Sequence, residues 1–171
     1  MNYVTFIQRQ NTRRILNIAS LIDTIKSRTK YRNFRLVHFE NMSLFEQWSV
    51  VYSSEVIIAA QGAALTWIRM AHSGTKIVEI TWPGWHSFFR RKAAKGAVCV
   101  PVQCSCITPE DVWKRYAKLW FNYDGVITDE WKEKLGEMSH QVHSKVQYDP
   151  TVWRDSDTTC NNTLVLNAIL A

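Results

Sequence analysis

Three arginines gather in a short loop that follows the first apolar run of the chain. Residues 8–14 read Gln-Arg-Gln-Asn-Thr-Arg-Arg. A guanidinium group can donate two parallel hydrogen bonds to phosphate oxygens, so Arg9 and Arg14 are candidate ligands of a diphosphate. Charged loops are also common on protein surfaces, and a solvated surface loop is the alternative interpretation.

A second candidate site is the turn Gln61-Gly62-Ala63-Ala64, which lies between the apolar run Val56–Ala60 and a helical pattern. Small residues allow backbone amides to approach a phosphate, and the positive end of a helix dipole favours negative charge. Tight packing of a strand against a helix needs the same small residues, and it is the alternative interpretation.

A third candidate is the segment Thr81-Trp82-Pro83-Gly84-Trp85-His86, which follows the apolar run Lys76–Ile80. Either tryptophan ring can stack on a base or a sugar, although an aromatic residue at a helix start usually belongs to a core. His86 is the first candidate general base, since an unperturbed imidazole titrates near neutral pH. Glu79, in the run before it, is the second candidate.

No metal site is expected. The cysteines are Cys99, Cys104, Cys106 and Cys160, and the Cys104-Ser105-Cys106 spacing is too tight and too isolated for a zinc site. Asp155-Ser156-Asp157 lies in a polar segment without a preceding apolar strand, and we interpret it as a turn. The even cysteine count and the sequons at Asn41 and Asn161 would permit disulfides and glycosylation in an oxidising compartment.

Composition narrows the function classes. The chain has 171 residues, a net charge of +6 and 46% hydrophobic residues, which is typical of a globular domain able to bind a polyanion. Nucleic-acid binding is disfavoured because no recognition motif accompanies the charge. There is no Walker loop, Gly-x-Gly-x-x-Gly, nucleophile elbow or zincin motif, and no apolar run is long enough to cross a bilayer.

The elements that must position these loops alternate between strand and helix. Short, β-branched runs that are apolar throughout predict the strands of a parallel sheet with helices on both faces, a Rossmann-like α/β fold. The predicted strands are Tyr3–Ile7, Phe34–Phe39, Val56–Ala60, Lys76–Ile80 and Val98–Val102. The predicted helices are Ile18–Ile25, Leu44–Tyr52, Leu65–Ala71 and Trp85–Lys95, followed by the C-terminal helices Pro109–Tyr123 and Thr128–Val146.

The domain is expected to span residues 1–147, with residues 148–171 as a polar tail of uncertain structure. The tail is rich in turn-forming residues up to Thr163, and its last apolar stretch, Leu164–Leu170, either packs onto the domain or belongs to a further segment. Ligands of an open parallel sheet bind beyond the carboxyl ends of the strands. The three candidate loops therefore meet at one edge.

Several blocks in this order resemble the C-terminal half of glycosyltransferase family 61. The blocks are Val4–Arg9, Arg14–Asn17, Met42–Gln47, Val56–Thr66 and Lys76–Ile80. The resemblance implies the nucleotide-sugar-binding half of a GT-B-type enzyme, with a separate N-terminal acceptor domain. It implies a UDP-sugar donor, transfer of GlcNAc, xylose or a similar sugar to a glycan or protein hydroxyl with inversion, and no required cofactor.

By this resemblance Arg9 and Arg14 hold the diphosphate, and the amides of Gly62, Ala63 and Ala64 cradle it. Glu46 either binds hydroxyl groups of the donor or forms a capping box with Ser43, and both interpretations stay open. Two positions depart from the family pattern: Gln61 replaces a histidine, and Trp67 replaces Asn or a small residue. Gln61 can donate a hydrogen bond to phosphate but cannot act as a general base.

The alternatives to an active transferase are a degenerate, non-catalytic homologue that binds a nucleotide or glycan, and one half of a split enzyme. We expect the isolated chain to bind a nucleotide sugar and to transfer it poorly. The expected location is the lumen of the secretory pathway, ER or Golgi, if the chain is a fragment of a eukaryotic enzyme, and the cytoplasm otherwise.

Overall fold

A computed structural model of the chain describes residues 3–81, 93–106, 117–118, 121–134 and 157–171, and every structural statement below concerns these residues. The chain divides into two compact units. The first comprises Met1–Ser105 with Asp157–Ala171, and the second comprises Cys106–Ser156. The first unit holds the sheet and all three candidate loops as far as they are described.

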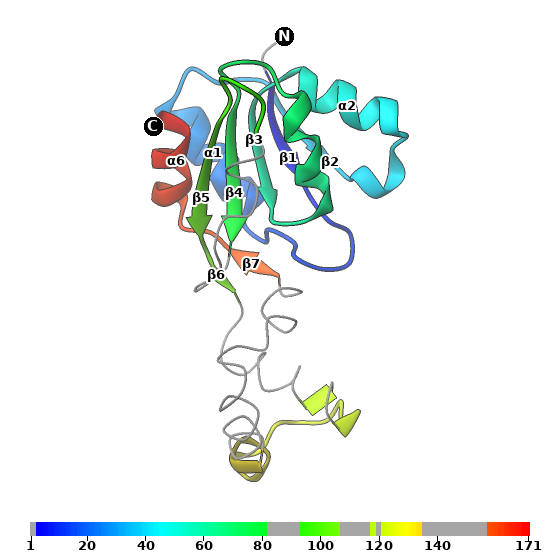
Figure 1. Cartoon of the computed structure of the whole chain (residues 1–171). Helices are drawn as coiled ribbons and strands as arrows, with labels where there is room; N and C mark the ends of the chain where they lie inside the picture. The colour runs from blue at the N-terminus through cyan, green and yellow to red at the C-terminus, as the bar shows by residue number, and fades with distance from the viewer. Residues whose placement is uncertain (1–2, 82–92, 107–116, 119–120, 135–156) are drawn as a thin grey trace. The chain divides into compact units, whose positions relative to one another are not determined.

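The first unit is built on a five-stranded sheet in which every neighbouring pair is parallel (Figure 1). The strands are β1 (Tyr3–Ile7), β2 (Phe34–Val37), β3 (Ser54–Ala60), β4 (Lys76–Thr81) and β5 (Val98–Gln103), in the spatial order β2-β1-β3-β4-β5. This confirms the predicted Rossmann-like α/β fold. The strand containing Val56–Ala60 is central, as burial on both faces requires.

Helices cover both faces of the sheet (Figure 1). The helical elements are α1 (Ile18–Arg28), the 3-10 helices η1 (Phe39–Asn41) and η2 (Ala63–Met70), α2 (Leu44–Tyr52) and α6 (Asn162–Leu170). Leu21 of α1 and Val165 of α6 share one core cluster, while Val51 of α2 and Leu65 of η2 share the other.

Side-chain alternation along the strands explains the two cores. Phe6 and Ile58 face the α1 and α6 layer, whereas Ile7 and Ile57 face the α2 and η2 layer. All four are 3% exposed or less. Successive side chains of a strand point to opposite faces, so a strand beneath two helical layers must be apolar at every position.

The strand order creates a topological switch point. The chain steps from β1 to β2 on one side and then returns past β1 to β3 on the other. Right-handed crossovers in opposite directions place α1 and α2 on opposite faces, as observed. The connections after β1 and β3 therefore diverge and leave a crevice at the carboxyl edge, where ligands of such sheets bind.

The C-terminal residues 157–171 are part of the first unit. Of the two expectations for Leu164–Leu170, packing onto the domain is what the structure shows, because α6 contacts α1, β4 and β5. A disulfide joins Cys104 to Cys160. Thr158–Thr159 forms the short strand β7, which pairs with β6 (Ser105–Cys106).

Several element boundaries differ from prediction; for example, α1 ends at Arg28 rather than Ile25, and β3 begins at Ser54 rather than Val56. The second strand ends at Val37 rather than Phe39, because Phe39 turns into η1 and its ring enters the core. Residues 93–95, expected at the end of a helix, are not helical, and the rest of that helix lies outside the described residues. The helix Pro109–Tyr123 also lies mostly outside them, whereas residues 129–134 of the last predicted helix are helical.

In the second unit, the described residues form a small aromatic cluster. The rings of Tyr123 and Trp131 stack with centroids 4.3 Å apart, and Phe121 meets Trp131 edge-on. The ammonium group of Lys134 lies over both Phe121 and Trp131. Across all described residues, no helix combines the length and apolar character that crossing a membrane requires.

Candidate functional site

A pocket of about 390 Å³ opens at the switch point, beyond the carboxyl ends of β1, β2 and β3. Its wall combines apolar side chains with an arginine and a glutamate. The described lining residues are Ile7, Gln8, Arg9, Phe39, Glu40, Leu44, Gln47, Ala60, Gly62, Ala63, Ala64, Thr66 and Trp67. An apolar pocket with a few polar groups is the usual form of a small-molecule site.

Two guanidinium groups converge on Gly62. A methyl group added at Gly62 would lie 3.2 Å from Nη1 of Arg13 and 3.6 Å from Nη1 of Arg9. Arg13 also donates a hydrogen bond of 2.8 Å to the carbonyl oxygen of Gln61. The basic loop and the glycine turn, predicted separately, therefore meet at Gly62, at the end of the pocket that Arg9 lines, which we call the cationic end. Arg13 is not among the described lining residues.

The amino terminus of η2 adds to the cationic end. Gly62 is its N-cap residue and has no side chain with which to cap this helix end. The first N–H groups of a helix have no acceptor within the helix. Ala63 and Ala64 both line the pocket, so the positive end of η2 faces the pocket. Binding of an anion by these amides stays a prediction.

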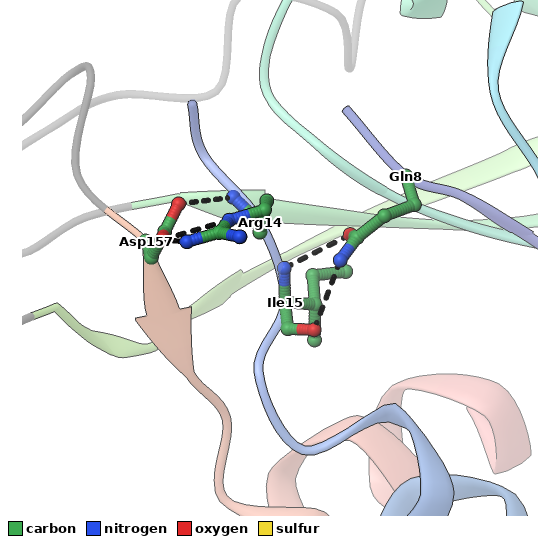
Figure 2. A network of polar contacts seen from close by, with 4 residues as sticks. All are labelled: Gln8, Arg14, Ile15 and Asp157. Carbon is green, nitrogen blue, oxygen red and sulfur yellow. Dashed lines mark hydrogen bonds and ion pairs between the residues drawn. The ribbon is translucent and has the colours of Figure 1, made fainter. Parts of the chain in front are cut away.

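Backbone bonding fixes the shape of the basic loop. Nε2 of Gln8 donates a hydrogen bond of 3.1 Å to the backbone carbonyl of Ile15, and Oε1 of Gln8 accepts one of 2.9 Å from the backbone amide of Ile15 (Figure 2). Arg13 adopts a left-handed backbone with φ of 57°, an uncommon conformation for a residue with a side chain. The loop thus closes on itself and turns Arg13 toward Gln61.

Arg14, the second predicted diphosphate ligand, lies elsewhere. Its Nε and Nη2 donate to Oδ2 of Asp157 at 2.9 and 2.6 Å, and its backbone amide donates to Oδ1 at 2.9 Å (Figure 2). These hydrogen bonds, then the negative charge of Asp157, raise the pKa of Arg14. Arg14 is not among the described residues that line the pocket.

A hydrogen-bonded glutamine holds the opposite wall. Nε2 of Gln47 donates to the carbonyls of Phe39 and Met42, each at 3.0 Å. Its Oε1 accepts from the indole of Trp67 at 2.7 Å. Gln47 thereby joins α2 to both 3-10 helices. The indole N–H of Trp67 therefore has a hydrogen-bond acceptor in this wall.

Glu46 forms the capping box rather than a pocket wall. Its Oε2 accepts from the backbone amide and the hydroxyl of Ser43, both at 2.7 Å, and its own amide donates to that hydroxyl. The hydroxyl hydrogen bond, followed by the backbone one, lowers the pKa of Glu46. The structure therefore favours the capping interpretation that the sequence left open.

The other predicted residues are placed as follows. Gln61 is 6% exposed, and its backbone amide donates to the backbone carbonyl of Ile80. Gln61 is not among the described residues that line the pocket. Glu79 is fully buried on the α2 and η2 face, with Oε2 3.9 Å from Sγ of Cys99. His86 lies outside the described residues. Catalytic roles for Glu79 and His86 stay predictions.

Sequence reasoning missed some of the residues that shape the site. Arg13 belonged to the predicted loop, but no sequence signal distinguishes it from Arg14, because the left-handed turn decides their directions. Glu40 had a usable signal, since it directly follows a predicted strand and therefore lies at the ligand-binding edge. Within the described residues, no group of three His, Cys, Asp or Glu side chains could hold a metal ion.

The doubly wound sheet and its switch-point pocket define a Rossmann-like α/β protein with a pocket suited to an anionic ligand. Residues 1–78 match the family model described as Glycosyltransferase 61, and over these residues the chain is similar to that family. The matched residues include the whole described lining of the pocket. Comparison with curated proteins finds no significant match.

Proposed function

We propose that the first unit binds the UDP-sugar donor of a glycosyltransferase in the switch-point pocket. One observation carries the proposal: Arg9, Arg13 and the uncapped start of η2 converge on Gly62 at the carboxyl edge. A diphosphate is the ligand group that matches the guanidinium group of Arg9 beside a cluster of backbone amides. The apolar remainder of the pocket suits a base or a sugar ring.

The proposed reaction is a single displacement. The oxygen of an acceptor hydroxyl, on a glycan or a protein, forms a bond to C1 of the sugar while the bond from C1 to the diphosphate oxygen breaks. UDP leaves with the electron pair, and a base takes the hydroxyl proton. Attack from the face opposite the leaving group inverts the anomeric centre. No other cofactor takes part, and the cationic end would stabilise the charge that develops on the leaving diphosphate.

The acceptor partner and the location belong to the same proposal. We assign acceptor binding to a further domain, because the described pocket is occupied by the donor in this scheme. The Cys104–Cys160 disulfide supports a location in the secretory lumen, since such bonds persist in oxidising compartments and are rare in the cytosol.

The second candidate function is a non-catalytic homologue that keeps the pocket. It is favoured by Gln61, which stands at the family position of a histidine and cannot take a proton from an acceptor. Gln61 is 6% exposed, so a side chain at this position is poorly placed to meet an acceptor. The identity of residue 61 therefore distinguishes the enzyme from the non-catalytic homologue less clearly than the sequence alone suggests.

Thermal unfolding with a ligand panel tests the proposal. The panel contains UDP, UDP-GlcNAc, UDP-xylose, GDP, ADP and inorganic phosphate. A uridine nucleotide at a hundred times its dissociation constant should stabilise the chain by about 2.7 kcal/mol. If none of the uridine nucleotides raises Tm at concentrations up to millimolar, donor binding is refuted.

A transfer assay separates the enzyme from the non-catalytic homologue. The wild type and Gln61→His are incubated with UDP-GlcNAc or UDP-xylose and mixed glycan acceptors, with and without a family N-terminal domain. Activity gained only by Gln61→His would support a degenerate site. Turnover by the wild type would establish the transferase, and turnover without the added domain would contradict the need for a separate acceptor domain.

A further inference from the structure

A carboxylate lies in the same pocket as the cationic end. Glu40 belongs to η1, directly after β2, and lines the pocket. Its Oε1 lies 3.7 Å from Nε of Arg9, and the two side chains are 41% and 36% exposed. At this distance Glu40 and Arg9 form an ion pair, but the two atoms are too far apart for a good hydrogen bond. Among the described residues, Glu40 has no closer polar partner, so its oxygens remain available to a ligand.

The strand order sets the distance between Glu40 and the cationic end. Gly62 follows β3 and Glu40 follows β2, with β1 and its Arg9 between them. Neighbouring strands lie roughly 4.8 Å apart, so the ends of β2 and β3 are separated by about 10 Å, and the side chain of Arg9 lies between them. If the phosphates of a nucleoside diphosphate lie at Gly62, its ribose extends either toward β2 or away from it. The pocket continues toward β2, where Phe39 and Glu40 line it, so the ribose is expected on that side.

The chemistry of a carboxylate fits the ribose and no other part of the nucleotide. An ionised carboxylate only accepts hydrogen bonds, and its two oxygens match two neighbouring hydroxyl donors. It repels a diphosphate, and a base offers few donors. Doubly wound dinucleotide-binding folds also use an acidic residue to bind ribose hydroxyls. There the acidic residue follows the glycine-rich turn in the sequence, whereas Glu40 precedes Gly62, so the two sites share the chemistry and not the strand positions.

Resting on the proposed function, we propose that Glu40 binds the 2′ and 3′ hydroxyl groups of the donor's ribose. Arg9, placed between the two ends, contacts the diphosphate and keeps its favourable charge interaction with Glu40. The carboxylate thus makes the pocket selective for ribonucleotides. The ion pair with Arg9 in the free protein keeps the carboxylate at the pocket wall before the ligand arrives.

Dissociation constants for UDP and 2′-deoxy-UDP test this assignment. They are measured by calorimetry on the wild type, Glu40→Ala and the control Glu55→Ala. Glu55 is a matched control because it also forms a 3.7 Å ion pair, with Lys30, but lies near the amino end of β3. A lost hydrogen bond to a charged group should weaken wild-type binding of 2′-deoxy-UDP by about tenfold or more relative to UDP.

Glu40→Ala should abolish this discrimination and bind UDP and 2′-deoxy-UDP equally, whereas Glu55→Ala should retain it. Equal weakening of both ligands, with discrimination intact, would mean that Glu40 only orients Arg9 and would overturn the assignment. If the wild type binds UDP and 2′-deoxy-UDP equally well, the assignment of Glu40 is also overturned, but the proposed function stands. A wild type that binds neither ligand overturns both proposals.

Discussion

The two halves of the loop after β1 differ in what they bind. In the first half, Arg9 lines the pocket 3.7 Å from a glutamate, and Arg13 donates to the carbonyl of Gln61 beside Gly62. The second half, from Arg14 to Asn17, is bonded to residues 157–162, and we call this contact the clasp. Arg9 of the pocket half therefore lies at the pocket, while Arg14 of the clasp half has its charge matched by Asp157.

The clasp combines backbone, side-chain and covalent links. Amide-to-carbonyl bonds of 2.8 Å run from Thr158 to Arg14 and from Leu16 to Thr158. The amide of Asn17 donates to the carbonyl of Cys160 at 2.7 Å, and its oxygen accepts from the Cys160 amide at 3.0 Å. The disulfide ties Cys160 to the end of β5. The clasp therefore fixes the second half of the loop to the C-terminal segment, away from the lining of the pocket.

The largest expected effect is loss of the covalent link. The disulfide closes a segment with a sequence separation of 56 residues. Cys160→Ser should lower the free energy of unfolding by about 4 kcal/mol, because the unfolded chain regains the entropy of that loop. Urea unfolding measures the change. Adding Cys104→Ser should cost little more, since both substitutions remove one bond, and an additive loss would contradict a shared disulfide.

The next effect separates Arg13 from Arg14. Arg13→Ala should weaken UDP binding by about 1.5–3 kcal/mol, the typical value of a hydrogen bond to a charged group. Arg14→Ala should leave UDP affinity unchanged and lower thermal stability, because it loses Asp157. Calorimetry at low salt gives the affinities and a melting curve gives the stability. Loss of affinity in Arg14→Ala would restore the role that the sequence alone assigned to it.

Gln8 connects the two halves, so its removal should affect both properties. Gln8→Ala deletes two hydrogen bonds to the backbone of Ile15 and should cost about 1–3 kcal/mol of stability. UDP binding should weaken as well, because the loop no longer holds the orientation of Arg13. Chemical unfolding and calorimetry report the two quantities. Stability lost at constant affinity would show that Arg13 keeps its position without this bridge.

The fold was predictable from the sequence because strands buried on both faces must be apolar throughout, and β3 is the clearest example. The ligand-binding edge followed from the same pattern. The directions of Arg13 and Arg14 were not predictable, since one left-handed residue and a partner 143 positions away decide them. Likewise, no local pattern pairs Cys104 with Cys160 or places α6 against the sheet, because both depend on contacts between distant segments.

The smallest expected effect tests whether Glu46 belongs to the scaffold. Ser43 holds the pKa of Glu46 below its ordinary value near 4.5 in the folded chain. A depressed folded pKa means that the ionised form stabilises the fold, so this contribution is complete above the unfolded pKa and disappears as the pH falls through the folded one. The stability difference between wild type and Glu46→Ala should therefore be constant near pH 7 and shrink below about pH 4.5. Melting curves between pH 7 and pH 3 follow the difference.

UDP affinity at pH 7 should be the same in both proteins, because the carboxylate binds Ser43 at the start of α2 and does not line the pocket. A weaker affinity in Glu46→Ala would place this glutamate with Arg13 in the binding half of the site.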